Sequence, residues 1–141
     1  MVEGRLQLAI ENNYEALARL MGEANEFLEA HSVPEQIVYK VNLILEEVLT
    51  NIIKYAFDDR RVHEIRVVLT LADTALTIEF VDDGREFNPL TAPQPETSRS
   101  ILDCPIGGLG IHLVKTMTES VAYRRDERKN VLVTRLKTDE A

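Results

Sequence analysis

A glycine run, Gly107–Gly110, opens directly onto an apolar helical pattern at Ile111–Val114, with no polar linker between them. Glycine lets a backbone approach a ligand closely, and the first turn of a helix leaves unpaired N–H groups at the positive end of its dipole. The run therefore indicates an anion site, although a tight strand-to-helix turn would use glycine in the same way. Neither a Walker A loop nor the dinucleotide pattern GxGxxG is present, so any nucleotide fold must be of another kind.

The residues before the run predict one strand and two long helices. Arg5 to Ile10 alternates apolar and polar residues, which is the period of a strand with one buried face. From Tyr14 to about Glu29 apolar residues recur at three- and four-residue steps, and Asn12 or Asn13 is placed to cap this amphipathic helix. A second helix is predicted from Pro34 to about Phe57, with an apolar stripe that belongs in the core.

Two pairs of alternating segments predict hairpins. Residues 65–69 and 76–80 flank one short turn, and residues 120–124 and 130–136 flank a charged turn, with a third helix predicted from about 109 to 118. Because such turns are too short for parallel crossovers, the paired strands should be antiparallel, with the helices gathered on one face. The predicted fold is α+β, a two-layer sandwich whose mixed, mostly antiparallel sheet carries about three helices on one face. We expect a single domain over residues 1–141.

A long irregular segment separates the first hairpin from the glycine run. Residues 85–106 contain four of the five prolines and show little periodicity. Loops of this length are uncommon inside compact domains and are usually functional or mobile. We therefore expect a lid at about 85–106.

The overall charge limits the partners. A net charge of −8 disfavours binding to nucleic acid or to an anionic membrane, because both require basic surface. Cys104 is the single cysteine, which excludes an intrachain disulfide and favours a reducing compartment. No signal peptide pattern or membrane-spanning apolar run occurs, so a cytoplasmic protein with protein or small-molecule partners is expected.

Two polar residues lie beside the apolar stripe of the second helix. Glu47 and Asn51 are four residues apart and so share one helix face. A lone Glu is more often a solvated edge, but an Asn inside a helix gives up helix propensity and needs hydrogen-bond partners. Its carbonyl oxygen is a hard ligand of the kind that magnesium accepts.

Asp82 ends an apolar strand, and Gly84 follows it. An ordinary Asp-Gly turn would explain this pair. The carboxylate could also accept a hydrogen bond from an exocyclic amine such as that of adenine.

Taken together, these motifs resemble a known superfamily. Glu47-x-x-x-Asn51, then Asp82-x-Gly84 with Phe87-Asn88-Pro89, then Gly107-Gly108-Leu109-Gly110 follow the order of the GHKL nucleotide-binding superfamily. That superfamily includes gyrase, histidine kinases and the mismatch-repair ATPases. Within the superfamily, the chain resembles the bacterial anti-sigma-factor serine kinases most closely, over roughly residues 36–137. This resemblance rests on the small size of the chain and on the sequence of residues 46–56, Glu-Glu-Val-Leu-Thr-Asn-Ile-Ile-Lys-Tyr-Ala.

The resemblance implies an ATP and Mg2+ site. Asp82 would bind the adenine amino group, Gly84 would leave room for the base, and Phe87 would belong to the same nucleotide-binding site. Asn51 would hold the magnesium ion, and Glu47 would act as general base at the γ-phosphate. The backbone N–H groups offered to the phosphates would be those of Gly108, Leu109, Gly110 and Ile111.

The sequence also departs from the family pattern at three places. Glu86 stands where many members have a second glycine, and Asp103-Cys104-Pro105 stands where the kinases often have a basic residue. The late Gly-Thr-Thr run has no clear counterpart, and Thr134 is only a weak candidate for it.

Two functions remain open at this stage. The first is an anti-sigma-type regulatory kinase that phosphorylates a serine or threonine of an antagonist protein and binds a sigma factor. The family resemblance also implies a homodimer. The alternative is a nucleotide-sensing module that selects a protein partner without significant phosphoryl transfer. A detached histidine-kinase catalytic domain fits less well, because none of the three histidines lies in a suitable helix pair.

Overall fold

The structure, a computed structural model, describes residues 3–88 and 108–139, with the backbone alone for 108–112. Within these ranges five strands form one sheet in the order β1-β2-β3-β5-β4, and each neighbouring pair is antiparallel. The strands are β1 (Gly4–Glu11), β2 (Glu64–Ala72), β3 (Ala75–Asp82), β4 (Ser120–Asp126) and β5 (Lys129–Lys137). Both predicted hairpins, β2–β3 and β4–β5, are confirmed, and the described sheet is antiparallel throughout rather than mixed.

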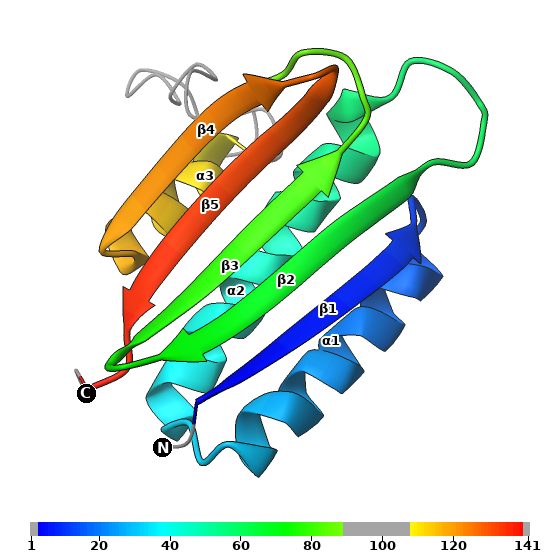
Figure 1. The fold of residues 1–141 in the computed structure, drawn as a ribbon. Coiled ribbons are helices and arrows are strands. Elements are labelled where there is room, and N and C mark those ends of the chain that lie inside the picture. Colours follow the sequence, from blue (N-terminus) through cyan, green and yellow to red (C-terminus); the bar gives the residue numbers. More distant parts are fainter. Residues whose placement is uncertain (1–2, 89–107, 140–141) are drawn as a thin grey trace.

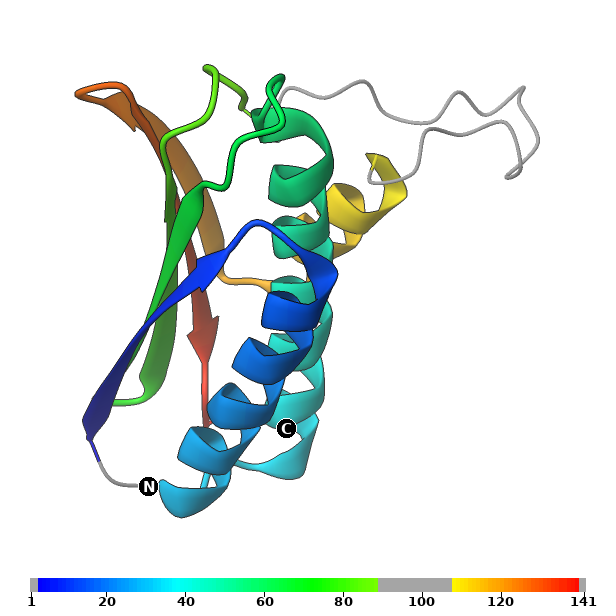
Figure 2. The same ribbon diagram turned by 90° about the vertical axis from the view of Figure 1, so that its right-hand side faces the viewer.

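The helices form a second layer on one face of this sheet. They are α1 (Tyr14–Ala30), α2 (Glu35–Asn51) and α3 (Gly108–Met117). Figure 2 shows the sheet edge-on with all three helices on the same side, and Figure 1 shows α2 running behind the middle of the sheet. The predicted α+β two-layer sandwich is therefore confirmed.

The helix ends follow local chemistry. The side chain of Asn13 caps α1 by accepting a hydrogen bond of 2.8 Å from the backbone N–H of Ala16. Pro34 lies just outside α2 as its N-cap residue, one position earlier than the first turn where we expected it. At its other end α2 does not stay α-helical to Phe57, because residues Ile52–Ala56 form a π-helical turn, η1.

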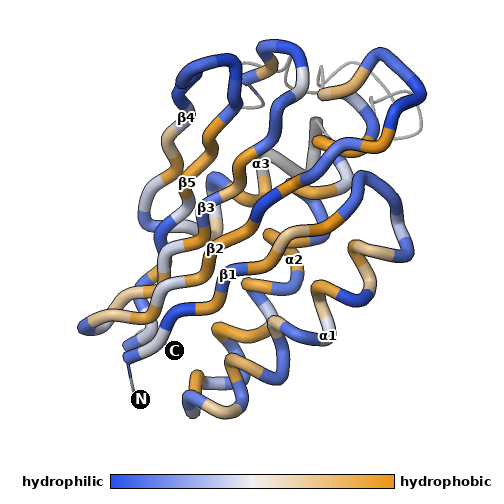
Figure 3. Tube along the Cα trace, turned by 45° about the vertical axis from the view of Figure 1, so that its right-hand side comes forward, coloured by the Kyte–Doolittle hydropathy of each residue, from blue (hydrophilic) through white to orange (hydrophobic). Residues whose placement is uncertain are grey.

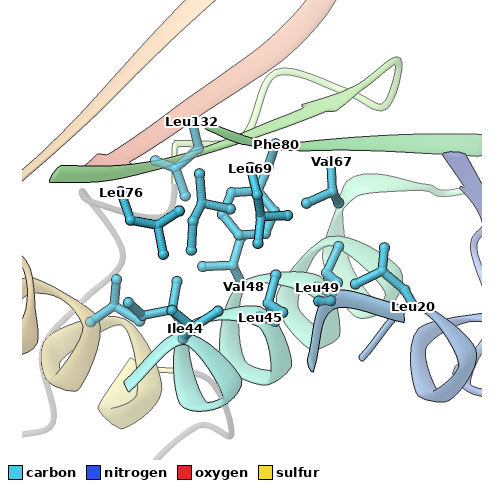
Figure 4. Close-up of a cluster of buried hydrophobic side chains, with 14 of the residues drawn as sticks. Leu20, Ile44, Leu45, Val48, Leu49, Val67, Leu69, Leu76, Phe80 and Leu132 are labelled. Carbon is cyan, nitrogen blue, oxygen red and sulfur yellow. The ribbon is translucent and has the colours of Figure 1, made fainter. Parts of the chain in front are cut away.

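The core lies between the two layers. The apolar stripe of α2 faces the inward side chains of β2, β3 and β5, and Figure 4 shows Val48 and Leu45 of the helix beneath Phe80, Leu69 and Leu132 of the sheet. Hydropathy along the chain alternates on the strands and runs in stripes on the helices (Figure 3). A pair of amides, Asn25 and Asn42, joins α1 to α2 with hydrogen bonds of 3.0 and 2.8 Å.

The end of β3, the start of β5 and the end of α2 meet at one end of the sandwich. The end of β3 lies opposite the start of β5, with Asp82 paired to Asn130 in the ladder. The π-helical turn at the end of α2 lies against both, since Arg85 N–H donates to the carbonyl of Ala56 at 2.8 Å. The predicted lid lies outside the described residues from 89 onward and stays a prediction.

Candidate functional site

A small cavity opens where the end of α2 faces the ends of β3 and β5. It measures about 10 Å3, close to the space of one water molecule. Asn51 of α2, Asp82 of β3 and Phe87 all line it, so two of the three predicted motifs meet here. The remaining lining residues are Val48, Ile52, Phe80, Tyr123, Asn130 and Leu132.

Asn51 presents an open acceptor at this cavity. Its side chain is 4% exposed, and its Nδ2 donates to the carbonyl oxygen of Glu47 at 2.8 Å. Among the described residues no group donates a hydrogen bond to its Oδ1. Among the described residues only Thr138 Oγ1 is a buried side-chain atom without a partner, so Asn51 Oδ1 is accessible to solvent. An accessible amide oxygen with no donor fits the oxygen ligand that a magnesium ion would need.

Glu47 lies one turn before Asn51 and is half-buried. Burial raises the pKa of the Glu47 carboxyl, the neighbouring Glu46 raises it further, and Lys54 opposes both. A carboxylate with a raised pKa is a better proton acceptor when ionised, which suits a general base. Its placement on the face of Asn51 follows from the four-residue spacing, as the sequence predicted.

Asp82 ends β3 and is 4% exposed. Its Oδ1 accepts the Gly84 N–H at 2.9 Å and the Asn130 Nδ2 at 2.9 Å. Burial raises the pKa of Asp82, while these two hydrogen bonds act in the opposite direction. The Asp-Gly pair therefore makes a local turn, and it also directs a carboxylate into the cavity wall.

Gly84 lies against the helix rather than against the cavity. A Cβ at this position would lie 2.7 Å from the Cβ of Ala56 and 2.8 Å from its carbonyl carbon. The close approach leaves no room for a side chain. The prediction that Gly84 makes space for a base remains untested, and its contact with η1 is a separate reason for glycine here.

Aromatic rings border the cavity. Phe87 packs near Tyr55 of η1, with ring centroids 6.0 Å apart and planes at 44°. Tyr123 of β4 also lines it, and burial raises the pKa of the Tyr123 hydroxyl. Flat apolar rings of this kind suit the faces of a planar base.

The predicted phosphate-binding segment begins α3. Gly108, Leu109, Gly110 and Ile111 form its first turn, whose N–H groups have no partners within the helix. The helix packs against α2, and Figure 2 shows it on the same side of the sheet as α2. The third motif thus comes to the same side of the molecule as Asn51.

Two residues beside the cavity were missed by the sequence analysis. Asn130 of β5 binds Asp82, and Arg125 of β4 donates from Nη1 to the Gly84 carbonyl at 2.8 Å. No spacing rule connects residues on these separate strands. An Asn directly before the apolar run Val131–Val133 was the one available signal.

Other candidates fall elsewhere. Thr134 is fully buried within the sheet, where its hydroxyl donates to the Ile78 carbonyl at 3.3 Å, and it does not line the cavity. The single cysteine, Cys104, lies outside the described residues. Those that are described include no cluster of three or more His, Cys, Asp or Glu side chains placed to hold a metal ion. Their helices also include none long and apolar enough to cross a membrane.

Known proteins share both sequence and fold with this chain. Serine/threonine-protein kinase BtrW of Bordetella bronchiseptica is 27% identical over 94 residues, covering 67% of this chain and 66% of BtrW, so the chain spans just under two thirds of that relative. Serine-protein kinase RsbW of Bacillus cereus is 28% identical over 136 residues, covering 92% of this chain and 82% of RsbW. RsbW of Listeria innocua is 26% identical over 134 residues, with 92% and 84% covered.

Solved structures agree on the fold. The histidine kinase domain of the blue-light activated histidine kinase of Erythrobacter litoralis superposes with a TM-score of 0.56 at 17% identity, covering 88% of this chain and 60% of that one. The histidine kinase AdeS of Acinetobacter baumannii gives a TM-score of 0.51 at 12% identity, with 99% and 70% covered. The model of the histidine kinase-like ATPase domain family matches residues 10–136. The chain therefore belongs to the histidine kinase-like ATPase domain family.

Proposed function

We propose that this protein binds ATP with Mg2+ and transfers the γ-phosphate to a serine or threonine of an antagonist protein, as a regulatory kinase of the anti-sigma type. The observation that carries the proposal is the meeting of Asn51 and Asp82 at one cavity, each with an oxygen that receives no hydrogen bond from the described residues. One oxygen is neutral and suits a metal ion, and the other is anionic and suits an amine.

The residues would divide the work as follows. Asp82 would accept the adenine amino group, with Phe87 against the base. The N–H groups of Gly108–Ile111 would bind the phosphates through the positive end of the α3 dipole. Asn51 would hold Mg2+, which when bound neutralises charge on the phosphates. Glu47 would take the proton of the attacking hydroxyl.

The partners follow from the family resemblance and from charge. A protein of net charge −8 favours protein partners over nucleic acid. We propose a sigma factor and an antagonist protein as these partners, with a homodimer as the binding form. The matched relatives in Listeria innocua and Bacillus cereus are serine-protein kinases by name, which supports the reaction class.

Binding and transfer can be tested separately. Calorimetry with ATP and Mg2+ should detect binding to the full chain, and Asp82→Asn should weaken it about tenfold or more, because the amide places a donor beside the adenine amine. A wild-type chain that gives no binding signal with ATP and Mg2+ would refute the proposal.

Phosphotransfer is tested with labelled ATP and the products of neighbouring genes. Glu47→Gln should lower the transfer rate by about 10²–10⁴-fold while ATP affinity stays near the wild-type value, since a general base acts in the transition state. Glu46→Gln is the matched control, because Glu46 is the adjacent residue and is exposed. Equal losses in both variants would exclude Glu47 as the base.

The size of the cavity favours keeping a second candidate, the nucleotide-sensing module. The space between Asn51, Asp82 and Asn130 holds about one water, so a bound base would extend beyond it or displace part of its wall. A displacement of the wall on nucleotide binding could itself select a partner. Wild-type protein that binds ATP, changes partner affinity on binding and labels no neighbouring gene product would support this second function.

A further inference from the structure

The side chain of Asn130 lies at the centre of the polar groups beside the cavity. It is 5% exposed. Its Nδ2 donates to Asp82 Oδ1 at 2.9 Å and to the carbonyl oxygen of Arg85 at 2.8 Å. One amide nitrogen thus joins the end of β3 to the segment that follows it.

The other end of the same amide is also fully used. Asn130 Oδ1 accepts from the backbone N–H of Phe87 at 3.2 Å and from Arg125 Nη1 at 3.0 Å. It also accepts from the hydroxyl of Tyr123. Because a backbone N–H and a guanidinium can only donate, and the Arg85 carbonyl can only accept, the network allows a single orientation of the amide.

This orientation determines which oxygen of Asp82 is available. Asp82 Oδ1 already receives the N–H groups of Gly84 and Asn130. Its Oδ2 receives no donor from the described residues, and Asp82 lines the cavity. An ionised carboxylate only accepts hydrogen bonds, so the available oxygen pairs with an N–H group and repels a carbonyl.

We propose that Asn130 is a positioning residue for base recognition. Its amide fixes which oxygen of Asp82 serves the ligand and holds Phe87 at the cavity wall, and so sets the preference for a base with an exocyclic amine over one with a carbonyl. The inference rests on the proposed ATP site and deepens it, since Asn130 itself need not touch the base.

A purely structural role would have a different consequence. If Asn130 only stabilised the turn after β3, its removal would lower the affinity for every nucleotide by the same factor. A role in positioning Asp82 changes the ratio of affinities, because a carboxylate that can rotate no longer opposes a carbonyl consistently. The ratio is therefore the quantity to measure.

The test is calorimetry of the full chain with ATP and with inosine triphosphate, both with Mg2+. Inosine triphosphate carries a carbonyl oxygen where ATP carries its amino group. We expect wild type to prefer ATP by at least about tenfold and Asn130→Ala to reduce that preference about tenfold or more. Asn42→Ala is the control, because it also removes a part-buried amide pair, between α1 and α2, away from the cavity.

A second variant, Arg125→Met, tests the same hydrogen-bond network if Asn130→Ala does not fold. Arg125 is exposed, so Arg125→Met should fold, yet it removes the guanidinium that binds both Asn130 Oδ1 and the Gly84 carbonyl. It should reduce the preference for ATP about two- to threefold, a fraction of the expected Asn130 effect. Arg124→Met is its matched control, since neighbouring residues of a strand point to opposite faces.

The outcomes separate the two proposals. If wild type binds ATP but Asn130→Ala and Arg125→Met keep the wild-type preference, the role of Asn130 is refuted while the ATP site stands. If wild type binds ATP and inosine triphosphate equally well, the inference also fails. Absence of any ATP binding by folded wild type overturns the proposed function and this inference together.

Discussion

Substitution of Gly84 by alanine tests how closely the segment after β3 approaches α2. A Cβ on Gly84 would meet the carbonyl carbon of Ala56 at 2.8 Å and its Cβ at 2.7 Å, with the carbonyl oxygen closer still. These are backbone atoms and a methyl group, which cannot rotate away. Gly84 is not among the residues with a left-handed backbone, so the expected effect is steric and not conformational.

The magnitude follows from the contacts that must shift. Relieving overlap in a packed region costs about 1–3 kcal/mol. Movement of this segment also strains the 2.8 Å hydrogen bond from the Arg85 N–H to the Ala56 carbonyl oxygen. The loss of such a hydrogen bond costs about 1 kcal/mol. We expect Gly84→Ala to lower the free energy of unfolding by about 2–4 kcal/mol, and to weaken ATP binding because Gly84 N–H holds Asp82.

Urea unfolding followed by circular dichroism measures this loss. Gly22→Ala is the matched control, since a Cβ at Gly22 in the exposed face of α1 meets nothing within 4 Å and should stabilise the helix by about 0.5–1 kcal/mol. Gly4→Ala should fall between them, because the obstacle there is the side chain of His31, which can rotate. If Gly84→Ala unfolds at the same urea concentration as wild type, the steric reasoning is wrong.

Three further changes test other parts of the structure. The pKa of His63 is raised chiefly by its hydrogen bond to Asp59, so the contribution of His63 to stability is complete below about pH 6.5 and is lost as pH rises through the raised pKa. Unfolding curves of His63→Gln measured at several pH values should lack this part of the pH dependence. A pH dependence equal to that of wild type would contradict the assignment. Thr138 Oγ1 is buried and has no hydrogen-bond partner among the residues that the structure describes, so Thr138→Val should be neutral or raise the free energy of unfolding by up to about 1 kcal/mol in thermal unfolding. A clear loss of stability would reveal a partner. Arg128 has φ 67° in the β4–β5 turn, so Arg128→Gly should raise the free energy of unfolding by about 0.5–1 kcal/mol, and a decrease would argue against strain at that residue.

The elements most readily predicted from the sequence are those whose signals are local. The apolar steps of α1 and α2 and the cap at Asn13 each depend on residues a few positions apart. The hairpins were found from alternation on either side of short turns, even though the β4–β5 turn uses Glu127 and Arg128 with positive φ in place of glycine. Strand order across β3 and β5 was not predictable in this way, because α3 and the residues before it separate the two strands in sequence.

The π-helical turn was missed for a related reason. The apolar stripe of α2 continues to Ile52. A search for apolar residues at three- and four-residue steps cannot detect a single turn of π-helix, in which hydrogen bonds span five residues. In the structure η1 directs the carbonyls of Tyr55 and Ala56 towards Arg85, whose Nε and backbone N–H each donate at 2.8 Å. The carbonyl groups at the carboxyl end of the helix thereby receive hydrogen bonds from the segment that follows Asp82. These bonds connect the motif on α2 to the motif on β3.

The candidate site shows the same division between local and long-range information. The Glu47–Asn51 pair depends on helical spacing, and the Asp82–Gly84 pair depends on one turn, so both were found. Asn130 comes opposite Asp82 only through the β3–β5 register.

The core sets that register. Leu132 and Leu136 point inward from β5, and a slip of one residue would turn both outward and bring Lys129 or Val131 opposite Asp82. The apolar packing of the sheet thus also determines which polar side chain reaches the candidate site. Residues of this kind carry no motif, and a family comparison based on motifs does not single them out.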